Sequence, residues 1–497
     1  MSVLVIDVGT SGLRAAIVND DSTLGVVCYE EFAPSTPAPG MVEFDATAMK
    51  QAVLRVARTA MASVSQISAA QTHAAQIHAV GITNQRASTI AWRRSTGEPL
   101  GPAIGWQDLR TIFDCIMAKT NHSIALQPNQ TATKAAWMLN NYVTDEAERA
   151  SEDICIGTVD SWVVSVLTQG AVHATDVSNA AVTGLSHSDG QTWNTDVMSI
   201  LGLHAHQFAT IVPSSGFIGH ATALDGAPPI MSMVGDQQAS LVGQGCISPG
   251  KTKITFGTGG MLDVFIGSQP PARAQRSTGG TFPIVAYSTS TEIFYGAEAI
   301  MLSAGTNIEW LRDDMQLVSS AAQTDEVAAT CATTEGVVYV PALLGLGTPH
   351  WDYGARGTLL GITRGTTRAH IVRAVLEGVA HRGVDLVDAA QVDTGLEITE
   401  LRVDGGMSRN ATFVQALADA SGRTVRVSLV TEATTMGAGF LAGVAAGVWK
   451  SLEEPCGATQ PASIVVPLGN PGVSRQQWGE AISRARSWIP DLSALDF

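Results

Sequence analysis

Two stretches of the sequence each combine an apolar run with a glycine and a threonine. Residues 3–14 read VLVIDVGTSGLR, and residues 254–260 read ITFGTGG. Glycine allows backbone N–H groups to close on an anion, and a threonine hydroxyl adds a further donor. Neither stretch has the spacing of a P-loop, and either one alone would be an ordinary tight turn after a strand. As a pair, one in each half, they predict a phosphate chain held between two related domains.

Two aspartates follow apolar strands in the same way and could supply the chemistry of phosphate transfer. Asp7 ends the first apolar run, where its carboxylate offers a hard oxygen to Mg²⁺, directly or through water. Asp236 follows the mostly apolar residues 231–234 and a glycine. It is the candidate general base, which would accept a proton from a substrate hydroxyl as that hydroxyl attacks the γ-phosphorus. An ordinary helix N-cap would also explain an aspartate at position 236.

A third group of residues has the types that hold a polyol. Residues 106–110 read WQDLR, so Trp106 offers a flat apolar wall beside an amide that both donates and accepts. Arg86 belongs to the polar tip of the apolar strand predicted at residues 79–82, and open α/β sheets bind ligands at such strand ends. The alternative for residues 106–110 is a core tryptophan beside a surface arginine.

The elements that must position these residues indicate an α/β protein. Residues 3–6, 13–18 and 24–29 predict an antiparallel meander, and residues 79–82, 231–234, 254–256 and 401–404 predict further strands. Helices are expected after Asp45, over 131–139, 371–379, 436–443 and 476–488, and after the glycine turn at 405–406. Asp160 is expected to cap a helix, and residues 304–310 are expected to open or interrupt one.

The glycine-containing run at residues 243–250 is the expected hinge between two halves. We therefore divide the chain into residues 1–245, which would bind the polyol and carry the base, and residues 246–497, which would bind the nucleotide. The two halves are expected to close on their ligands about this hinge.

Composition limits the classes of partner. The net charge of −16 argues against nucleic acid or an anionic membrane, although it does not exclude nucleotides. The six cysteines are scattered without a C-x-x-C pair, which favours reduced thiols and a cytoplasmic location. We find no signal-peptide pattern and no apolar run of transmembrane length, so we expect no membrane partner.

Several spaced motifs resemble those of the FGGY carbohydrate kinases, most closely the glycerol kinases, within the actin/Hsp70/sugar-kinase superfamily. The motifs are GITNQR at 81–86, GTVDSW at 157–162, GDQQ at 235–238, GTG at 257–259, GTLLGI at 357–362 with HI at 370–371 and AVLE at 374–377, and VDGG at 403–406. The resemblance spans nearly the whole chain. It implies two actin-like, ribonuclease-H-like domains with a nucleotide cleft between them, and ATP-dependent phosphorylation of a polyol or sugar with Mg²⁺. A homodimer is a possible assembly.

The resemblance also implies a role for each candidate residue. Asp236 matches the catalytic base, and Asp7 matches the acid near the metal. The positions that match the phosphate-contacting loops are Thr10, Ser11, Arg14, Gly257 and Thr258; those around the nucleoside are Gly305, Glu309, Gly406 and Asn410; and the polyol-contacting set is Arg86, Trp106, Asp236 and Gln237.

Three positions depart from the glycerol kinase pattern. Ala87 stands where that pattern has glutamate, Asn129 where it has tyrosine, and Met261 where it has phenylalanine. Loss of a carboxylate removes an acceptor for a terminal hydroxyl, which would weaken binding by roughly 1–3 kcal/mol. Glycerol therefore remains one candidate substrate, and a larger polyol or a ketose is the alternative. A non-kinase, nucleotide-dependent regulator of the same superfamily is a third hypothesis, although no peptide- or DNA-binding appendage accompanies the motifs.

Overall fold

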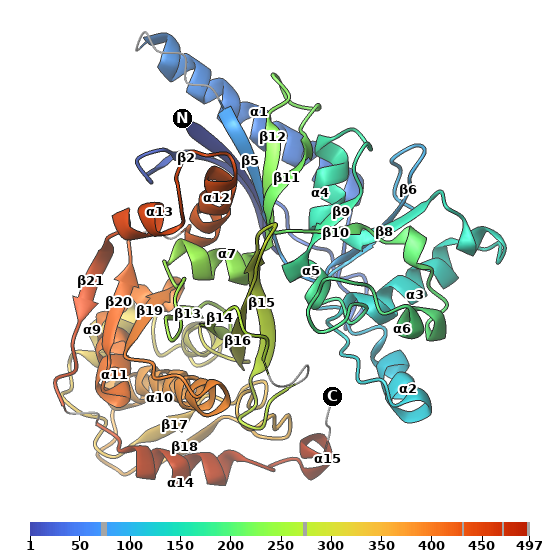
Figure 1. Ribbon diagram of the computed structural model, residues 1–497. Coiled ribbons are helices and arrows are strands. Elements are labelled where there is room, and N and C mark those ends of the chain that lie inside the picture. Colours follow the sequence, from blue (N-terminus) through green and yellow to red (C-terminus); the bar gives the residue numbers. More distant parts are fainter. Residues whose placement is uncertain (71–76, 272–275, 430–431, 470–471, 495–497) are drawn as a thin grey trace.

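The computed structural model describes residues 1–497 except 71–76, 272–275, 430–431, 470–471 and 495–497. Figure 1 shows two α/β halves, with the C-terminal half at the lower left and the N-terminal sheet above it. A smaller subdomain of the N-terminal half lies at the right. This arrangement confirms the expected α/β fold of two halves.

The N-terminal half is built on a six-stranded sheet with the order β11-β12-β5-β1-β2-β3. β1 is buried at every position, whereas exposure alternates along β3, as expected for a central strand and an edge strand. β1, β2 and β3 are antiparallel, which confirms the predicted meander, and β5 runs parallel to β1. The strands are β1 (Ser2–Val8), β2 (Gly12–Asn19), β3 (Leu24–Glu31), β5 (Ile77–Asn84), β11 (Ser215–His220) and β12 (Pro229–Gly235).

A subdomain is inserted between β5 and β11 of this sheet and is joined by β4. Its four-stranded sheet has the order β4-β7-β6-β8, and β9 pairs with β10 beside it. The strands are β4 (Glu43–Phe44), β6 (Thr89–Arg93), β7 (Ala103–Ile104), β8 (Ile154–Thr158), β9 (Ala174–Asp176) and β10 (Thr210–Val212). The helices of this half are α1 (Ala46–Ala70), α2 (Ile112–His122), α3 (Thr131–Tyr142), α4 (Val159–Leu167), α5 (Val177–Ala181) and α6 (Thr195–Ile200).

The C-terminal half is built on a seven-stranded sheet with the order β15-β16-β14-β13-β19-β20-β21. Its strands are β13 (Thr252–Phe256), β14 (Gly260–Gly267), β15 (Phe282–Ser288), β16 (Ile293–Met301), β19 (Glu400–Asp404), β20 (Thr424–Ser428) and β21 (Pro461–Val465), and β17 (Val338–Val340) pairs separately with β18 (Thr358–Leu360). The helices are α8 (Thr306–Glu309), α9 (Gln323–Ala328), α10 (Arg368–Thr394), α11 (Ala411–Ser421), α13 (Glu453–Ala458), α14 (Arg475–Ala485) and α15 (Pro490–Ser493).

The two sheets share one plan. In each, three antiparallel strands are followed by two parallel strands and one antiparallel edge strand, so that β3-β2-β1-β5-β12-β11 corresponds to β16-β14-β13-β19-β20-β21. The correspondence places β1 and β13, and therefore the two glycine–threonine turns, at equivalent positions.

Helices α7 (Asp236–Gly243) and α12 (Ala433–Ala445) join the halves. α12 belongs to the C-terminal half of the sequence, yet Met436 and Phe440 pack in one apolar core with Val3 and Val5 of the N-terminal sheet. A Cβ on Gly437 would lie 1.8 Å from the carbonyl oxygen of Ala239, so glycine is what permits the two helices to cross this closely.

Two helix boundaries predicted from the sequence differ from those in the structure. Asp160 does not cap a helix: β8 runs directly into α4, Thr158 occupies the N-cap position, and Asp160 lies inside the first turn. Its buried carboxylate instead accepts hydrogen bonds from the hydroxyls of Thr158 and Thr175. The last long helix, expected over 476–488, is α14 and ends at Ala485.

Residues 304–310 behave as expected, because α8 begins after Gly305 and passes into a π-helical turn at Trp310–Asp314. In the part of the chain that is described, no helix is long and apolar enough to cross a membrane.

Candidate active site

Both glycine–threonine stretches form the turn of a β-hairpin. In the first, the N–H of Gly9 donates to the carbonyl oxygen of Gly12 at 2.9 Å, between β1 and β2. In the second, the turn between β13 and β14 contacts the start of α8, where the N–H of Gly305 donates to the carbonyl oxygen of Gly257 at 2.8 Å. A Cβ on Gly305 would lie 2.5 Å from that same oxygen. The close approach of turn and helix therefore requires glycine at position 305.

The first hairpin is bonded to the predicted polyol residues. The indole N–H of Trp106 donates to Thr10 Oγ1 at 3.1 Å, and its backbone N–H donates to Ser88 Oγ at 3.0 Å. Gln85 accepts from Ser88 Oγ and donates to the carbonyl of Gly9, at 3.0 and 3.2 Å. Trp106 is 37 % exposed and is not a core tryptophan. The structure thus brings a predicted phosphate-loop residue and a predicted substrate residue into contact.

Asp236 is the first residue of α7, and Gly235 takes the N-cap position. The N-cap explanation for this aspartate is therefore wrong. Its Oδ1 accepts from the N–H of Gln237 at 2.8 Å and lies 3.6 Å from Nε of Arg86. Burial raises the pKa of Asp236 above the usual 3.8, and the Arg86 charge opposes this rise. A carboxylate with a raised pKa and 29 % of its side chain exposed is suited to accepting a proton from a ligand.

Arg86 bridges the two halves. It follows β5 in the N-terminal half, and its Nη2 donates to Glu298 Oε2 of β16 at 2.7 Å. Glu298 is buried, and burial raises the pKa of its carboxyl although Arg86 opposes that shift. The buried Nη1 of Arg86 has no hydrogen-bond partner among the described residues. An unpaired guanidinium donor beside Asp236 is available for a substrate hydroxyl.

Glu298 ends a row of three charged residues that sit directly opposite one another on β13, β14 and β16, in the order Lys253, Asp263, Glu298. Lys253 Nζ lies 2.8 Å from Asp263 Oδ2, and both side chains are fully buried. Lys253 Nζ also donates to Gln237 Oε1 at 2.6 Å. Apart from the ion pair with Lys253, the carboxylate oxygens of Asp263 have no hydrogen-bond partner among the described residues. The C-terminal sheet thus fixes the amide of Gln237 and the guanidinium of Arg86.

This row of charged residues was not predicted from the sequence. Its signal was present, because each of the three is the lone charged residue in the stretches TKITF, GMLDVFIG and GAEAIM. An unpaired charge in a buried strand costs several kcal/mol, so a lone charge in an apolar strand indicates a partner elsewhere in the fold.

Asp7 lies at the end of β1 and faces α12. Its Oδ2 accepts from Thr435 Oγ1 at 3.2 Å and lies 3.6 Å from Nε of Arg14. Burial raises the pKa of Asp7 to about 6, against the opposing charge of Arg14, and the carboxylate of Asp236 adds to the rise. Arg14 also pairs with Glu432. Its expected contact with phosphate stays a prediction, because two acids already hold it.

The donor set fits a magnesium ion that reaches the protein with a nucleotide. Among the described residues, no group of three or more His, Cys, Asp or Glu could hold a metal by itself. Asp7 and Asp236 repel each other, and a divalent cation bound to phosphates would relieve that repulsion.

The four residues expected around the nucleoside lie at α8 and its N-cap and between β19 and α11. Glu309 is exposed at the end of α8. No described atom beyond its chain neighbours lies within 4 Å of a Cβ built on Gly406, so this backbone has open space in front of it. Asn410 caps α11, accepting from the N–H of Phe413 at 2.9 Å, and its Nδ2 donates to Thr324 Oγ1 at 2.9 Å. Their role in nucleotide binding stays a prediction.

The three positions that depart from the glycerol kinase pattern have different surroundings in the structure. Ala87 is buried with φ of 63°, in the left-handed region, and its carbonyl accepts from Thr131 Oγ1 at 3.2 Å. Asn129 is exposed, and its carbonyl accepts from Lys134 Nζ at 3.3 Å. Met261 is half-buried on β14. A non-glycine residue in the left-handed region is strained, so the loop around Ala87 is held in place by its neighbours.

Two family models match the chain. The model of the N-terminal domain of the FGGY family of carbohydrate kinases matches residues 2–243, and the model of the C-terminal domain matches residues 252–446.

Curated relatives and solved structures agree with these matches. A glycerol kinase from Bordetella parapertussis is 38 % identical over 503 residues, which cover 98 % of this chain and 97 % of the relative. The crystal structure of Plasmodium falciparum glycerol kinase with ADP has a TM-score of 0.89 at 26 % identity, covering 97 % and 98 % of the two chains. Xylulose kinase from Rhodospirillum rubrum shares the fold, with a TM-score of 0.84 at 19 % identity over 99 % of this chain and all of the other.

Proposed function

The chain belongs to the FGGY family of carbohydrate kinases, and from this premise we propose that it transfers the γ-phosphate of ATP to a hydroxyl of glycerol or a related polyol, with Asp236 as the general base. The observation that carries the assignment of the base is the position of Asp236, 3.6 Å from the guanidinium of Arg86. Arg86 itself has an unpaired donor.

In the proposed reaction, Asp236 accepts the proton of a substrate hydroxyl while the hydroxyl oxygen attacks the γ-phosphorus. The bond between the γ-phosphorus and the β–γ bridging oxygen breaks, and ADP leaves. Arg86, Trp106 and Gln237 hold the polyol so that one hydroxyl faces Asp236. Most of the rate enhancement in phosphoryl transfer comes from position and charge, and the base contributes on the order of 10²–10⁴-fold.

The proposed phosphate contacts come from both hairpins. Thr10 and Ser11 supply hydroxyls and backbone N–H groups from the first hairpin, Gly257 and Thr258 supply them from the second, and Arg14 adds a charge. Mg²⁺, when bound, neutralises the phosphate charge, and Asp7 is the residue that would hold it, directly or through water. Gly305, Glu309, Gly406 and Asn410 are the proposed contacts of the nucleoside.

The choice between glycerol and a larger substrate rests on three residues. Ala87 offers no side-chain acceptor, and neither Asn129 nor Met261 supplies an aromatic wall. Methionine is flexible and adapts to a longer chain. A larger polyol or a ketose is therefore the second candidate substrate.

A coupled assay of ADP release would decide between the two candidates. It would compare kcat/KM for glycerol, four- and five-carbon polyols and ketoses, in wild type and in Ala87→Glu. We expect at least one larger substrate to be accepted and Ala87→Glu to favour glycerol. If glycerol is already the best substrate and Ala87→Glu does not improve it, the argument from these positions fails.

We also propose that the chain divides near residue 245 and that the halves close when both ligands bind. Arg86 and Gln237 of one half already contact Glu298 and Lys253 of the other, so closure would act on the two hairpins, which must both reach one triphosphate. Small-angle scattering with and without nucleotide and substrate would test closure. An unchanged radius at saturation with both ligands would argue for a preclosed cleft.

A further inference from the structure

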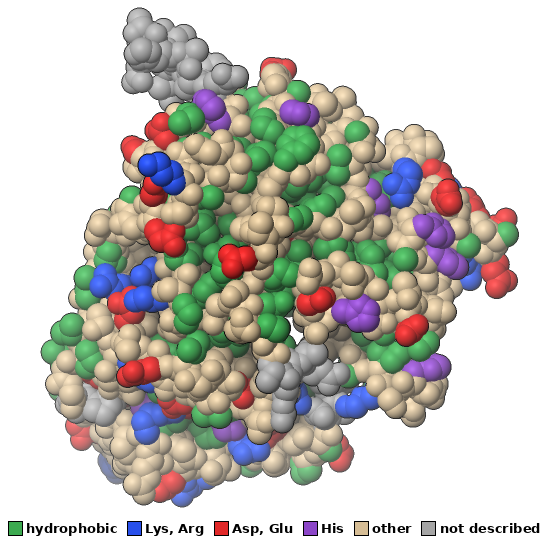
Figure 2. All heavy atoms as spheres, in the orientation of Figure 1, with side chains coloured by type: hydrophobic (Ala, Val, Ile, Leu, Met, Phe, Trp, Pro, Cys, Tyr) green, Lys and Arg blue, Asp and Glu red, His purple; other side chains and the backbone are tan. Residues whose placement is uncertain are grey.

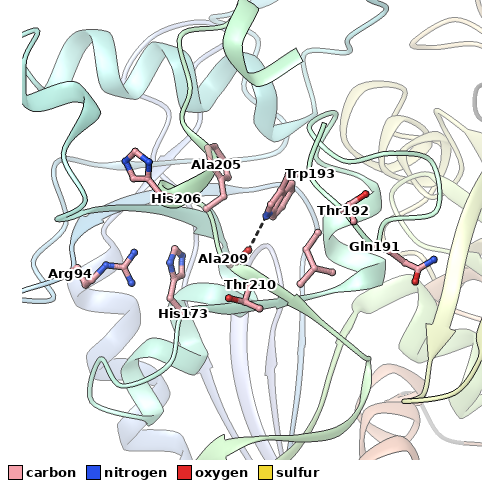
Figure 3. Close-up of a pocket in the computed structure, with 11 residues that line it drawn as sticks. Arg94, His173, Gln191, Thr192, Trp193, Ala205, His206, Ala209 and Thr210 are labelled. Atoms are coloured by element: carbon pink, nitrogen blue, oxygen red, sulfur yellow. Dashed lines mark hydrogen bonds between the residues drawn. The ribbon is translucent and has the colours of Figure 1, made fainter. Parts of the chain in front are cut away.

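The small subdomain contains a cavity of about 510 Å³ that the proposed kinase reaction does not use. Figure 3 shows that its lining comes from the end of β6, the start of β9 and the segments 191–193 and 205–211. The side chains that matter here are Arg94, His173, Gln191, Trp193, His206 and Thr210.

Strand β6 separates this cavity from the proposed active site. Arg86 and Ala87 precede β6, whereas Arg94 directly follows it. Five extended residues span about 17 Å, so a ligand in the cavity would not contact the polyol residues. None of the residues that line the cavity belongs to the proposed kinase site.

The cavity presents one guanidinium that no acid neutralises. Nε of Arg94 donates to the carbonyl oxygen of Glu152 at 3.2 Å, and among the described residues no acid forms an ion pair with Arg94. Its neighbour Arg93, by contrast, pairs with Glu148 at 2.5 Å and lies 3.7 Å from Asp153. Arg94 is exposed, so water solvates its charge in the free protein and the guanidinium is available to an anionic ligand at the cavity.

Histidines gather in the same region. Five of the eleven histidines lie between residues 122 and 206, and Figure 2 shows purple side chains over the subdomain at the right. Figure 3 shows His206 and Arg94 on the same side of the cavity. The Nε2–H of His206 donates to the carbonyl oxygen of Ala150 at 3.1 Å, which fixes the ring beside the cavity.

His173 has an unsatisfied nitrogen. Its ring packs edge-on against Trp92 at 5.0 Å, and it hydrogen-bonds the backbone of Ile156, while the buried Nε2 has no partner among the described residues. Burial and the nearby Arg94 charge lower the pKa of His173 to about 4, so the ring is neutral at pH 7. Because the other nitrogen donates to the backbone, Nε2 is an acceptor and matches a ligand hydroxyl. Because this nitrogen is buried, a ligand hydroxyl would reach it only after neighbouring side chains move.

The opposite wall is flat and rigid. The indole N–H of Trp193 donates to the carbonyl oxygen of Ala209 at 2.9 Å, as the dashed line in Figure 3 shows. Phe208 packs against the same indole with ring centres 5.5 Å apart. The exposed polar side chains of Gln191 and Thr210 flank this wall. An apolar ring face with amide and hydroxyl groups beside it suits a hydroxylated carbon chain.

We propose that this cavity is a second ligand site, specific for a small hydroxycarboxylate such as the acid form of a sugar. The carboxylate would bind Arg94 and lie near His206, one hydroxyl would donate to His173 Nε2, and the carbon chain would lie on Trp193. This assignment does not depend on the identity of the kinase substrate.

Charge favours a carboxylate over a phosphate ester. Arg94 is the one residue lining the cavity that carries a permanent positive charge, which matches a monoanion, whereas a phosphate monoester carries about −1.5 to −2 at pH 7. Asp189 adds negative charge close by, since its carboxylate accepts from the N–H of Gln191 at 3.0 Å. A planar guanidinium can also donate two parallel hydrogen bonds to the two oxygens of a carboxylate.

Isothermal titration of the full chain with D-gluconate, glucose and glucose 6-phosphate tests the proposal, because the three share one carbon skeleton. We expect gluconate to bind at least about tenfold more tightly than either of the other two, the difference that one charge-assisted hydrogen bond supports. Arg94→Gln should weaken gluconate binding by about tenfold or more and leave kcat for the kinase reaction unchanged. Arg93→Gln is the matched control and should bind gluconate as wild type does.

Three results would overturn the assignment. The first is the absence of gluconate binding at millimolar concentration, and the second is equal gluconate affinity in Arg94→Gln and wild type, which would place the ligand elsewhere. Tighter binding of glucose 6-phosphate than of gluconate would show that the charge argument is wrong.

Discussion

The two hairpins that carry a glycine and a threonine occupy equivalent places in two similar sheets, but they are held by different groups. The first is held by a side chain as well as by main chain, since Thr10 Oγ1 accepts from the indole of Trp106 and the carbonyl oxygen of Ser11 accepts from the N–H of Phe32 at 2.9 Å. The second is bonded through the backbone, since Gly257 and Thr258 accept from the N–H groups of Gly305 and Ala304, at 2.8 and 2.9 Å. The first hairpin therefore depends on a tryptophan side chain, whereas the second depends on the close approach of the backbone before α8.

The acidic residues beside the two hairpins also have different partners. Asp7 ends β1 and lies opposite Thr83 of β5, whereas the equivalent position on β13 is Thr255, opposite Asp404 of β19. Asp404 Oδ2 accepts from Gln244 Nε2 at 2.9 Å and so helps to join the halves. Asp7 is thus the proposed ligand acid of the first copy, whereas Asp404, which lies on the strand beside the equivalent position, joins the halves in the second.

The largest effect is expected from the side-chain chemistry of the N-terminal half. Asp236→Asn should lower kcat by on the order of 10²–10⁴-fold, because the base is lost, and should leave ATP affinity nearly unchanged. Steady-state kinetics and direct titration with ATP measure the two quantities. Retention of more than about a tenth of the wild-type kcat would contradict the assignment of Asp236 as the base.

The second effect tests whether the other hairpin depends on its backbone. Gly305→Ala puts a methyl group 2.5 Å from the carbonyl oxygen of Gly257 and should destabilise the fold by about 1–3 kcal/mol. Urea denaturation measures this change. The control is Gly479→Ala on α14, where no described atom beyond its chain neighbours and its own helix lies within 4 Å, and which should stabilise by about 0.5–1 kcal/mol. Equal stability of Gly305→Ala and wild type would contradict the backbone argument.

A smaller effect is expected from a single side-chain contact of the first hairpin. Thr10→Val removes the acceptor for the indole N–H of Trp106 and should lower kcat/KM for the polyol by roughly 2–12-fold, equivalent to about 0.5–1.5 kcal/mol. Thr330→Val on the surface, which loses one local hydrogen bond to Val327, serves as the control. Identical kinetics of the two variants would mean that the contact does not position Trp106.

The smallest effect is a shift of the pH profile. Asp236 must be ionised to act as a base, so kcat/KM should rise with pH through its raised pKa. Arg86 lowers that pKa, so Arg86→Gln should move the acid limb of the profile to higher pH, whereas Arg86→Lys keeps the charge and should move it less. A limb that stays in place or moves to lower pH in Arg86→Gln would contradict the contact between these two groups.

Local patterns in the sequence predicted the strands and most helices correctly. The apolar residues 3–6 form a fully buried central strand, and the glycine turn at 405–406 leads into a helix as expected. Asp160 was misplaced because its partners, Thr158 and Thr175, come together only in the folded subdomain. A capping pattern cannot indicate that β8 continues into α4 without a loop.

The candidate site was predictable residue by residue but not as an arrangement. Asp236, Arg86 and Gln237 were identified from their motifs, yet the row of Lys253, Asp263 and Glu298 was not. Each member of the row is one charge in an apolar strand, and the register that sets them opposite one another depends on pairing between distant segments. Likewise, no local signal showed that α12 would cover the N-terminal sheet.

The position of α12 has a consequence for the growing polypeptide. The apolar face that Val3 and Val5 present is closed by Met436 and Phe440, which leave the ribosome about 200 residues after the N-terminal half has ended near residue 245. At synthesis rates of about 5–20 residues per second, that face would stay open to other chains for roughly 10–40 s. Leu241 and Val242 of α7 belong to the same core and are synthesised earlier, so the part of the face that α12 covers is the part that stays exposed, and chaperones could bind it during that time.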